Sequence, residues 1–324
     1  MTIILNANLD ADLAKAAELL HAGELVAVPT ETVYGLAADA RQTNAVRAIF
    51  AAKQRPLNHP LIVHIGDVDQ LSEWAGHITE TAWNLAQHFW PGPLTLVLEA
   101  VPGVSCSVVT GGLNTVALRM PAHPALLTLL KRSGLALAAP SANPHKMLSP
   151  TSAAQVMATM ADKLAAVLDG GECSLGIEST ILDLTGSEPC ILRAGPITAS
   201  EIATHLGCSV AQPQHHQKII SGNQLVHYRP LTPLHLKTAL QMCDLPGYSV
   251  VRLFLSDASE QMYETSLLTR IMPRNKAAYA RLLYRILFEV DQLAAQEIWV
   301  ESPPSEEEWM DVHDRLSRAS VRIL

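Results

Sequence analysis

No stretch of the 324-residue sequence reaches the roughly 20 consecutive apolar residues that a membrane-spanning helix needs. The first residues, MTIILNANLDADLAK, lack the basic segment that precedes the apolar part of a secretory signal. Paired cysteines are missing too, because the five cysteines are scattered and never spaced as C-x-x-C. This argues against a disulfide framework and a structural zinc site. We therefore expect a protein of the reducing cytoplasm without membrane contact and without a metal site of its own.

Basic residues are scarce as well. The net charge is -8, with 31 Asp and Glu against 23 Lys and Arg, which does not suggest a broad nucleic-acid-binding surface. Contact with nucleic acids of any kind is therefore expected to be weak or absent. The few bases of residues 1–205 lie in or beside the most distinctive segments. A local cationic pocket in an acidic protein suits a small anionic ligand better than a polynucleotide.

The two familiar glycine-rich nucleotide motifs are absent: there is no G-x-x-x-x-G-K-[ST], and no G-x-G-x-x-G before a helix. What is present is an alternation of helical and strand patterns, which is typical of an α/β domain. The spacing predicts helices at 10–21, 44–53, 78–90 and 152–160, the second with Asn44 as its N-cap. It predicts strands at 24–29, 60–65, 94–100, 115–121, 135–140, 179–185 and 189–195.

The regular pattern stops after residue 205. Residues 206–238 are rich in Pro, His and Gln, and we interpret them as a linker or lid. Beyond them the pattern resumes and predicts a small second α/β domain over 239–324. Its expected strands are 248–255 and 297–303, and its expected helices are 276–295 and 306–320.

Two polar loops follow predicted strands. The first is Pro29-Thr30-Glu31-Thr32-Val33-Tyr34-Gly35-Leu36, and strand carboxyl ends are where α/β sheets place ligands. A capped strand-to-helix turn would use the same residue types, so the pattern alone leaves both interpretations open. The second is Ala139-Pro140-Ser141-Ala142-Asn143-Pro144, which offers hydrogen-bonding groups, although an isolated S-A-N is more often a turn.

Several cations lie in unusual places. Lys53 and Arg55 are two residues apart before a proline and can converge on one polyphosphate, although a solvated basic helix end is the commoner use. Arg119 lies in the apolar pattern TVALRMP, where a charge needs a partner, either an internal carboxylate or that of a ligand. Arg193 in ILRAG is a lone cation of the same kind. His64, within an apolar run, is typical of a satisfied core residue.

Eight motifs, taken in order, resemble those of the YrdC-like family of threonylcarbamoyl-AMP synthases: PTETVYGL, K-x-R-P, HPLIVHI, FWPGPLTLVL, VALRMP, APSAN, GIESTI and ILRAG. The resemblance covers residues 10–205. Longer members carry a small domain after a linker with an H-Y-x-P motif, which here is His227-Tyr228-Arg229-Pro230. The resemblance implies a YrdC-like twisted mixed sheet with helices around an open cavity, followed by a smaller Rossmann-like α/β C-terminal domain.

The resemblance also implies a nucleotidyltransferase that converts L-threonine, bicarbonate and ATP with Mg²⁺ into L-threonylcarbamoyladenylate and pyrophosphate. A tRNA threonylcarbamoyl transferase would then use the product to modify tRNA. By matching position, the residues implied around threonine are Thr32, His64, Arg119, Ala139 and Ser179. Those implied around ATP are Arg55, His59, Thr115, Ser141, Ser149, Arg193 and, from the linker, Tyr228. Lys53 and Arg55 are the residues implied in catalysis, through charge neutralisation at the phosphates.

Two residues depart from the family pattern: Gln54 stands where glycine is common, and Arg229 where alanine is common. Gln54 is expected to alter loop flexibility, and Arg229 either to contact phosphate or to point to solvent. Two other functions compete: a module that binds RNA or nucleotide without catalysis, and a carbamoyltransferase, in which this domain belongs to a longer chain with zinc-finger-like cysteines. The acidic balance counts against the first, and the lack of cysteine clusters against the second.

Overall fold

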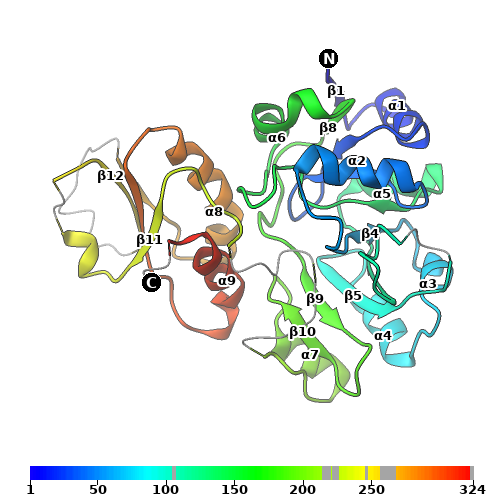
Figure 1. Cartoon of the computed structure of the whole chain (residues 1–324). Helices are drawn as coiled ribbons and strands as arrows, with labels where there is room; N and C mark the ends of the chain where they lie inside the picture. Colours follow the sequence, from blue (N-terminus) through cyan, green and yellow to red (C-terminus); the bar gives the residue numbers. More distant parts are fainter. Residues whose placement is uncertain (104–106, 214–219, 221–225, 245–246, 256–267, 322–324) are drawn as a thin grey trace. The chain divides into compact units, whose positions relative to one another are not determined.

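The computed structural model describes residues 1–324 except 104–106, 214–219, 221–225, 245–246, 256–267 and 322–324 (Figure 1). The chain divides into two units. The first consists of Met1–His145, Ser149–Ser174 and Glu178–Asn223, and the second of Lys146–Leu148, Leu175–Ile177 and Gln224–Leu324. In the described part of the chain, no helix has the length and apolar character needed to cross a membrane.

A ten-stranded mixed sheet forms the centre of the first unit, in the order β1-β8-β2-β3-β7-β4-β6-β5-β9-β10. The strands are β1 Ile3–Asn6, β2 Val26–Val28, β3 Gly35–Asp39, β4 Ile62–His64, β5 Leu94–Glu99, β6 Thr115–Arg119, β7 Leu137–Ala138, β8 Ala166–Asp169, β9 Thr180–Asp183 and β10 Cys190–Arg193. Strands β4 and β6 are parallel, whereas β5 is antiparallel to β6 and parallel to β9. The mixed sheet confirms the predicted fold class of this part.

Seven helices cover the sheet of the first unit within its described residues: α1 Asp10–His21, α2 Thr43–Lys53, α3 Leu71–Trp74, α4 Glu80–Phe89, α5 Pro124–Ser133, α6 Ala153–Met160 and α7 Ala199–Leu206. Helices α1 and α5 pack together, and α2 packs on β3 (Figure 1). A large apolar core joins helix side chains such as Ile49 and Leu85 to strand side chains such as Leu96 and Leu118. Helices α2 and α4, which carry Ile49 and Leu85, bury one face of the central strands β4, β6, β5 and β9.

Local sequence signals place α1 correctly and miss some helix and turn details. Helix α2 begins at Thr43, so Asn44 is not its N-cap; Gln42, whose side chain donates to the carbonyl of His21, holds that place. The polar loop that contains Thr32 leads into strand β3, which is antiparallel to β2. The strand-to-helix turn considered from the pattern is therefore wrong, because the chain doubles back within the sheet.

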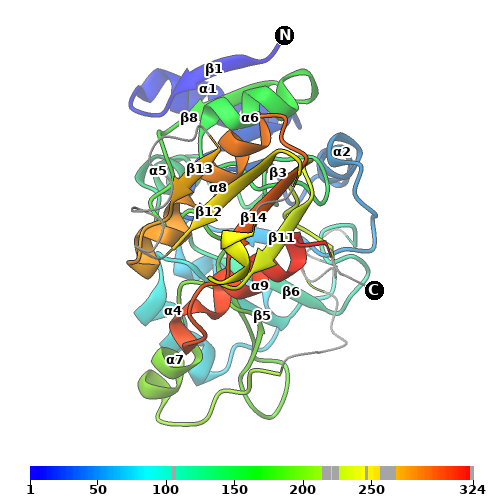
Figure 2. The ribbon, with the colours of Figure 1, turned by 90° about the vertical axis from the view of Figure 1, so that its left-hand side faces the viewer.

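The second unit is a smaller parallel sheet, in the order β11-β14-β12-β13 (Figure 2). Its strands are β11 Leu234–Lys237, β12 Val250–Phe254, β13 Thr269–Ile271 and β14 Glu297–Glu301, and its helices are α8 Lys276–Asp291 and α9 Met310–Ala319. Strand β11 lies within the segment interpreted as a linker. A parallel sheet in which helix α8 joins β13 to β14 agrees with the Rossmann-like arrangement that the resemblance implies.

Candidate active site

The face of the large sheet opposite the helix-covered core carries His64, Thr115 and Arg119. Side chains two residues apart in a strand share a face. Thr115 and Arg119 of β6 therefore lie on one face of the sheet. Ile62 and His64 of β4 lie on the same face, because His64 is the register partner of Arg119. The intervening side chains of these strands enter the main core, among them Leu61, Val63, Val116 and Leu118. The alternation in the sequence thus separates a structural face from a face available to ligands.

Arg119 is buried in an ion pair with Glu31. Its Nη2 donates to Glu31 Oε1 at 2.6 Å, and the two side chains are 4% and 9% exposed. Arg119 Nη1 donates to Thr32 Oγ1 at 3.0 Å, and Nε donates to the carbonyl of Gly92 at 3.2 Å. The partner of Arg119 is therefore an internal carboxylate, which is one of the two alternatives that the sequence left open. Within the described residues, three of the five N–H groups of Arg119 have acceptors, which leaves two for a ligand.

His64 lies beside Arg119, because the two residues are register partners in the parallel pair of β4 and β6. Only 3% of His64 is exposed. Burial lowers the pKa of His64 to about 3, and the neighbouring Arg119 charge acts in the same direction. The ring is therefore neutral at physiological pH and a weak base.

His64 should make the fold sensitive to acid. In the unfolded chain its pKa is near 6.5, whereas in the folded chain it is about 3. Between these values the unfolded state binds more protons, so stability is lost as the pH falls below the unfolded value. We expect this one group to remove at most about 1.4 kcal/mol of unfolding free energy per pH unit there. Urea unfolding from about pH 7 to about pH 5 gives the unfolding free energy at each pH. For His64→Gln this free energy should fall less steeply with falling pH than for the wild type. Equal pH dependence of the two proteins would show that His64 is not the source of the acid sensitivity.

Ser179 and Arg193 form a second polar group on the same face. Ser179 Oγ lies 2.8 Å from Thr95 Oγ1, and Arg193 Nη2 donates to Ser179 Oγ at 3.0 Å. Arg193 Nε also donates to the Ser179 carbonyl at 3.0 Å. Gly195 permits this close packing, because a Cβ there would lie 2.2 Å from the Thr180 nitrogen. Arg193 thus fixes the position of Ser179, in addition to any ligand contact.

Lys53 is buried against the loop that contains Ser141. Its ammonium donates to the Ser141 carbonyl at 2.5 Å, to the Asn143 carbonyl, and to Asn143 Oδ1 at 3.2 Å. These three acceptors match the three N–H groups of a lysine. Burial lowers the pKa of Lys53 well below its ordinary value, with Arg55 adding to the effect and Glu178 opposing it. In this structure Lys53 holds the loop, and direct contact with phosphate stays a prediction.

The other residues implied around ATP lie on loops of the first unit. Arg55 Nη2 donates to the Pro60 carbonyl at 3.1 Å. Ser149 Oγ donates to Glu178 Oε1 at 2.6 Å. The rings of His59 and His145 lie 5.9 Å apart, and the backbone nitrogen of His145 donates to the Lys53 carbonyl. Lys53, at the end of helix α2, is thus bonded to the Ser141 loop, and the charges of Arg55 and of Glu178, the partner of Ser149, act on it.

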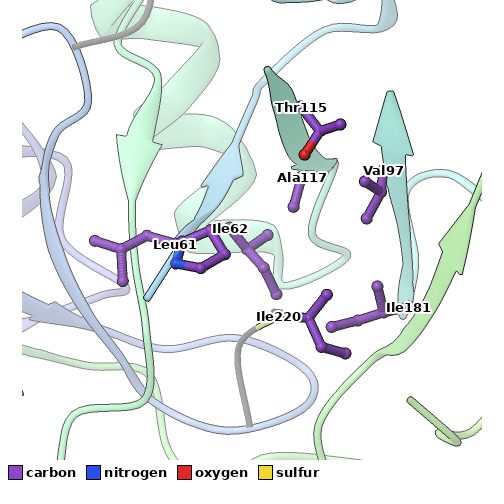
Figure 3. Close-up of a pocket in the computed structure, with 8 residues that line it drawn as sticks. Leu61, Ile62, Val97, Thr115, Ala117, Ile181 and Ile220 are labelled. Carbon is purple, nitrogen blue, oxygen red and sulfur yellow. The ribbon is translucent and has the colours of Figure 1, made fainter. Parts of the chain in front are cut away.

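An apolar recess lies between side chains of strands β4, β6, β5 and β9 (Figure 3). Ile62, Val97, Ala117 and Ile181 line it, with Thr115 at its rim, and its empty volume, including the part open to solvent, is about 320 Å³. Ile220, from the segment interpreted as a linker, packs against the same side chains. Ile220 therefore belongs to the first unit and packs at this recess. Figure 3 shows Thr115 and Ala117 on one strand, facing Val97 on the next.

Tyr228 lies inside the second unit. It is 1% exposed and adopts a left-handed backbone conformation with φ 60°. Its ring stacks on that of Tyr284 at 5.8 Å, and the Arg315 guanidinium lies 5.2 Å from it. In this structure Tyr228 is a core residue of its unit, so its closure over the nucleotide stays a prediction.

The two departures from the family pattern have structural explanations. Gln54 ends helix α2 in a left-handed conformation with φ 55°, where glycine is favoured. Arg229 Nη2 donates to the Ser320 carbonyl at 3.0 Å, at the end of helix α9. Neither alternative considered for Arg229, phosphate or solvent, describes this contact, because the carbonyl at the helix end attracts the cation.

Comparison with known proteins divides the chain near residue 196, before the structural boundary near residue 223. Residues 18–195 match a family model described as "Telomere recombination", and residues 197–321 match one described as "Threonylcarbamoyl-AMP synthase, C-terminal domain". The threonylcarbamoyl-AMP synthase of Pyrococcus abyssi is 46% identical over 241 residues, 71% of this chain and 70% of the relative. That of Bacillus subtilis is 44% identical over 229 residues, 69% of this chain and 66% of the relative.

The agreement extends through both units. The crystal structure of P. abyssi Sua5 complexed with L-threonine matches with a TM-score of 0.89 at 34% identity, covering 99% of this chain and 97% of that one. The chain belongs to the threonylcarbamoyl-AMP synthase family. Membership confirms the fold class and the enzyme class predicted from the motifs. The sequence matches span about two thirds of the length of the two relatives, 66% and 70%.

The structure adds polar residues to the site that the motifs did not assign. Glu31 and Thr30 hold Arg119 and Thr32, and Thr95 holds Ser179. Asn143 binds Lys53. Thr95 was detectable, since a lone hydroxyl in the apolar strand LTLVL is the same kind of signal as Arg119 in its strand. Glu31 was visible in its motif, but nothing in the sequence showed which cation it binds.

Proposed function

We propose that this chain condenses L-threonine, bicarbonate and Mg²⁺-bound ATP into L-threonylcarbamoyladenylate and pyrophosphate. The observation that carries the proposal is the distribution of charge over one site. Around Arg119 the cation is balanced by Glu31, and His64 is neutral, so this part suits a zwitterionic amino acid. Lys53, Arg55 and Arg193 are three buried cations, and Glu178 is the carboxylate that acts on Lys53, an arrangement that suits a polyphosphate.

Residue roles follow from these surroundings. The two remaining N–H groups of Arg119 can bind the threonine carboxylate, while Thr32 and Ser179 read its polar groups. The apolar recess beside Thr115 suits the adenine ring, because flat apolar groups bind in apolar slots with a few polar atoms at the rim. The P. abyssi relative has been crystallised in complex with L-threonine, which supports L-threonine as a substrate.

The proposed chemistry needs no protein nucleophile. The threonine amine and bicarbonate give an N-carboxylate with loss of water, and its oxyanion attacks the α-phosphorus of ATP. The new P–O bond forms as the bond to the β-phosphate oxygen breaks, and pyrophosphate leaves. Arg55 and Arg193 neutralise charge on the phosphates, and Lys53 keeps the Ser141 loop in place. Mg²⁺ would enter on the ATP phosphates; the described residues include no group of three His, Cys, Asp or Glu side chains that could hold a metal ion alone.

Pyrophosphate release tests the proposal. The purified chain is mixed with ATP, Mg²⁺ and bicarbonate, with and without L-threonine, and pyrophosphate is measured. We expect release to require threonine, because its N-carboxylate is the attacking group. Release that ignores threonine would contradict the proposed reaction and point to the carbamoyltransferase alternative. Tight, salt-dependent tRNA binding without release would favour the RNA-binding module.

The product belongs to a longer sequence of reactions. A threonylcarbamoyladenylate is an activated acyl group, and we propose that a separate tRNA threonylcarbamoyl transferase consumes it. We also propose a cytoplasmic location, because the reaction uses ATP and because the five cysteines of the sequence are scattered and never spaced as C-x-x-C.

A further inference from the structure

The hydroxyl of Ser149 has a fixed direction. Its Oγ donates to Glu178 Oε1 at 2.6 Å, and the two residues are only 2% and 6% exposed. An ionised carboxylate can only accept hydrogen bonds and a hydroxyl has a single proton, so the proton of Ser149 points to Glu178. The short distance is typical of a hydroxyl bound to a charged oxygen. The proton of Ser149 is therefore already used before a ligand arrives.

Glu178 acts as a negative charge in this part of the site. Lys53 is buried nearby, and the charge of Glu178 raises the pKa of Lys53 against the larger effects of burial and of Arg55. A carboxylate beside a buried cation is favoured in its ionised form, in which both oxygens accept. The hydrogen bond from Ser149 to Glu178 therefore keeps one direction.

The oxygen of Ser149 keeps two lone pairs for a ligand. Among the described residues, no N–H or O–H group donates to Ser149 Oγ, whose hydrogen bond is the one to Glu178. Lone pairs attract a hydroxyl or amino hydrogen and repel another acceptor. The phosphate oxygens of ATP are acceptors, whereas its ribose hydroxyls and its adenine amino group carry hydrogens. Ser149 can therefore form a hydrogen bond only with the nucleoside part of ATP.

We propose that Glu178 is a positioning residue that fixes Ser149 as a hydrogen-bond acceptor, and that Ser149 recognises a donor group of the nucleoside, a ribose hydroxyl or the adenine amino group. This inference rests on the proposed function and deepens it, because it states which part of ATP Ser149 contacts. Glu178 does not need to touch the nucleotide. A site with an acceptor oriented in this way discriminates against an analogue that lacks the donor, because a buried lone pair is then left without a partner.

Calorimetry on the full chain at saturating Mg²⁺ tests the proposal. The probes are ATP, 2′-deoxy-ATP, 3′-deoxy-ATP and purine riboside triphosphate, which lacks the amino group. We expect the wild type to bind one of the three analogues at least about fivefold more weakly than ATP, and that analogue identifies the donor. In Ser149→Ala this preference for ATP should fall by at least about threefold, because the acceptor is gone.

Glu178→Gln tests the positioning role. The amide of the new side chain can donate to Ser149, which frees the serine proton, so the preference for ATP over the same analogue should also fall by at least about threefold. The readout is the ratio of the two affinities. Loss of the Glu178 charge beside Lys53 acts equally on ATP and on the analogue, and therefore cancels in that ratio.

Two controls separate this role from others. Inorganic tripolyphosphate with Mg²⁺ carries no nucleoside, so Ser149→Ala should change its affinity by less than about twofold. Thr198→Val removes a similar bond from a hydroxyl to a carboxylate, from Thr198 Oγ1 to Glu201 Oε2 at 2.8 Å in the cap of helix α7. It should lower the melting temperature without changing the preference for ATP.

A bond that only ties two segments together would give a different pattern. Ser149→Ala would then melt at a lower temperature and keep the wild-type preference for ATP, which would overturn the proposal. Weaker binding of tripolyphosphate by Ser149→Ala, or a wild type without preference among the four nucleotides, would overturn it as well. The expected preferences without threonine-dependent pyrophosphate release would contradict only the proposed reaction. A wild type that does not bind ATP would overturn both.

Discussion

Replacing Arg119 by methionine is expected to abolish threonine-dependent pyrophosphate release and to lower the free energy of unfolding by about 3–5 kcal/mol. The loss of activity follows from removal of the group that binds the threonine carboxylate and orients Thr32. The loss of stability has a separate cause, because Glu31 would remain buried without its cation. Urea unfolding and pyrophosphate release, measured on the same preparation, give both quantities.

The double variant Glu31→Gln with Arg119→Met separates the two effects. Removing both charges removes the buried unpaired carboxylate, so more than half of the lost stability should return while activity stays absent. The control is Arg132→Met, which breaks the exposed pair with Asp10, 60% and 79% exposed, and should cost at most about 1 kcal/mol. If the double variant were as unstable as Arg119→Met, the ion pair would not be the source of the loss.

Replacing Lys53 by methionine is expected to raise the KM for ATP by at least about tenfold and to lower the free energy of unfolding by about 2–4 kcal/mol. The substitution keeps an apolar side chain of similar length but leaves the oxygens of Ser141 and Asn143 without the ammonium. The loop that presents Ser141 to the nucleotide should then lose its fixed position. Steady-state kinetics at saturating threonine and urea unfolding measure the two effects.

Two further variants decide whether Lys53 acts through the loop or on phosphate directly. Asn143→Ala removes one of the three acceptors and should cause a smaller change of the same kind. Lys131→Met, at an exposed lysine of helix α5, should change neither quantity. A Lys53→Met enzyme with unchanged stability and unchanged KM but a much lower kcat would instead show that the ammonium acts on the reacting phosphates.

The sequence by itself determined the elements whose signals are local. Apolar spacing and Gly23 define helix α1 at Asp10–His21, and alternation in TVALRMP distinguishes the core side chains of β6 from Thr115 and Arg119. The order of motifs determined the family. These features depend on neighbours within a few residues or on short contiguous motifs, so no knowledge of contacts was needed.

Only the tertiary structure decided which groups meet. Glu31 and Arg119 are 88 residues apart and Lys53 and Asn143 are 90 apart, and strand pairing and loop packing bring each pair together. The sequence required a partner for Arg119 because a buried charge is costly, but an internal carboxylate and a ligand satisfy that requirement equally well. The same holds for Tyr228, whose motif implies a lid and whose ring lies in the core of the second unit. Local patterns show that a buried charge or polar group requires a partner, and the packing of distant segments decides which group that partner is.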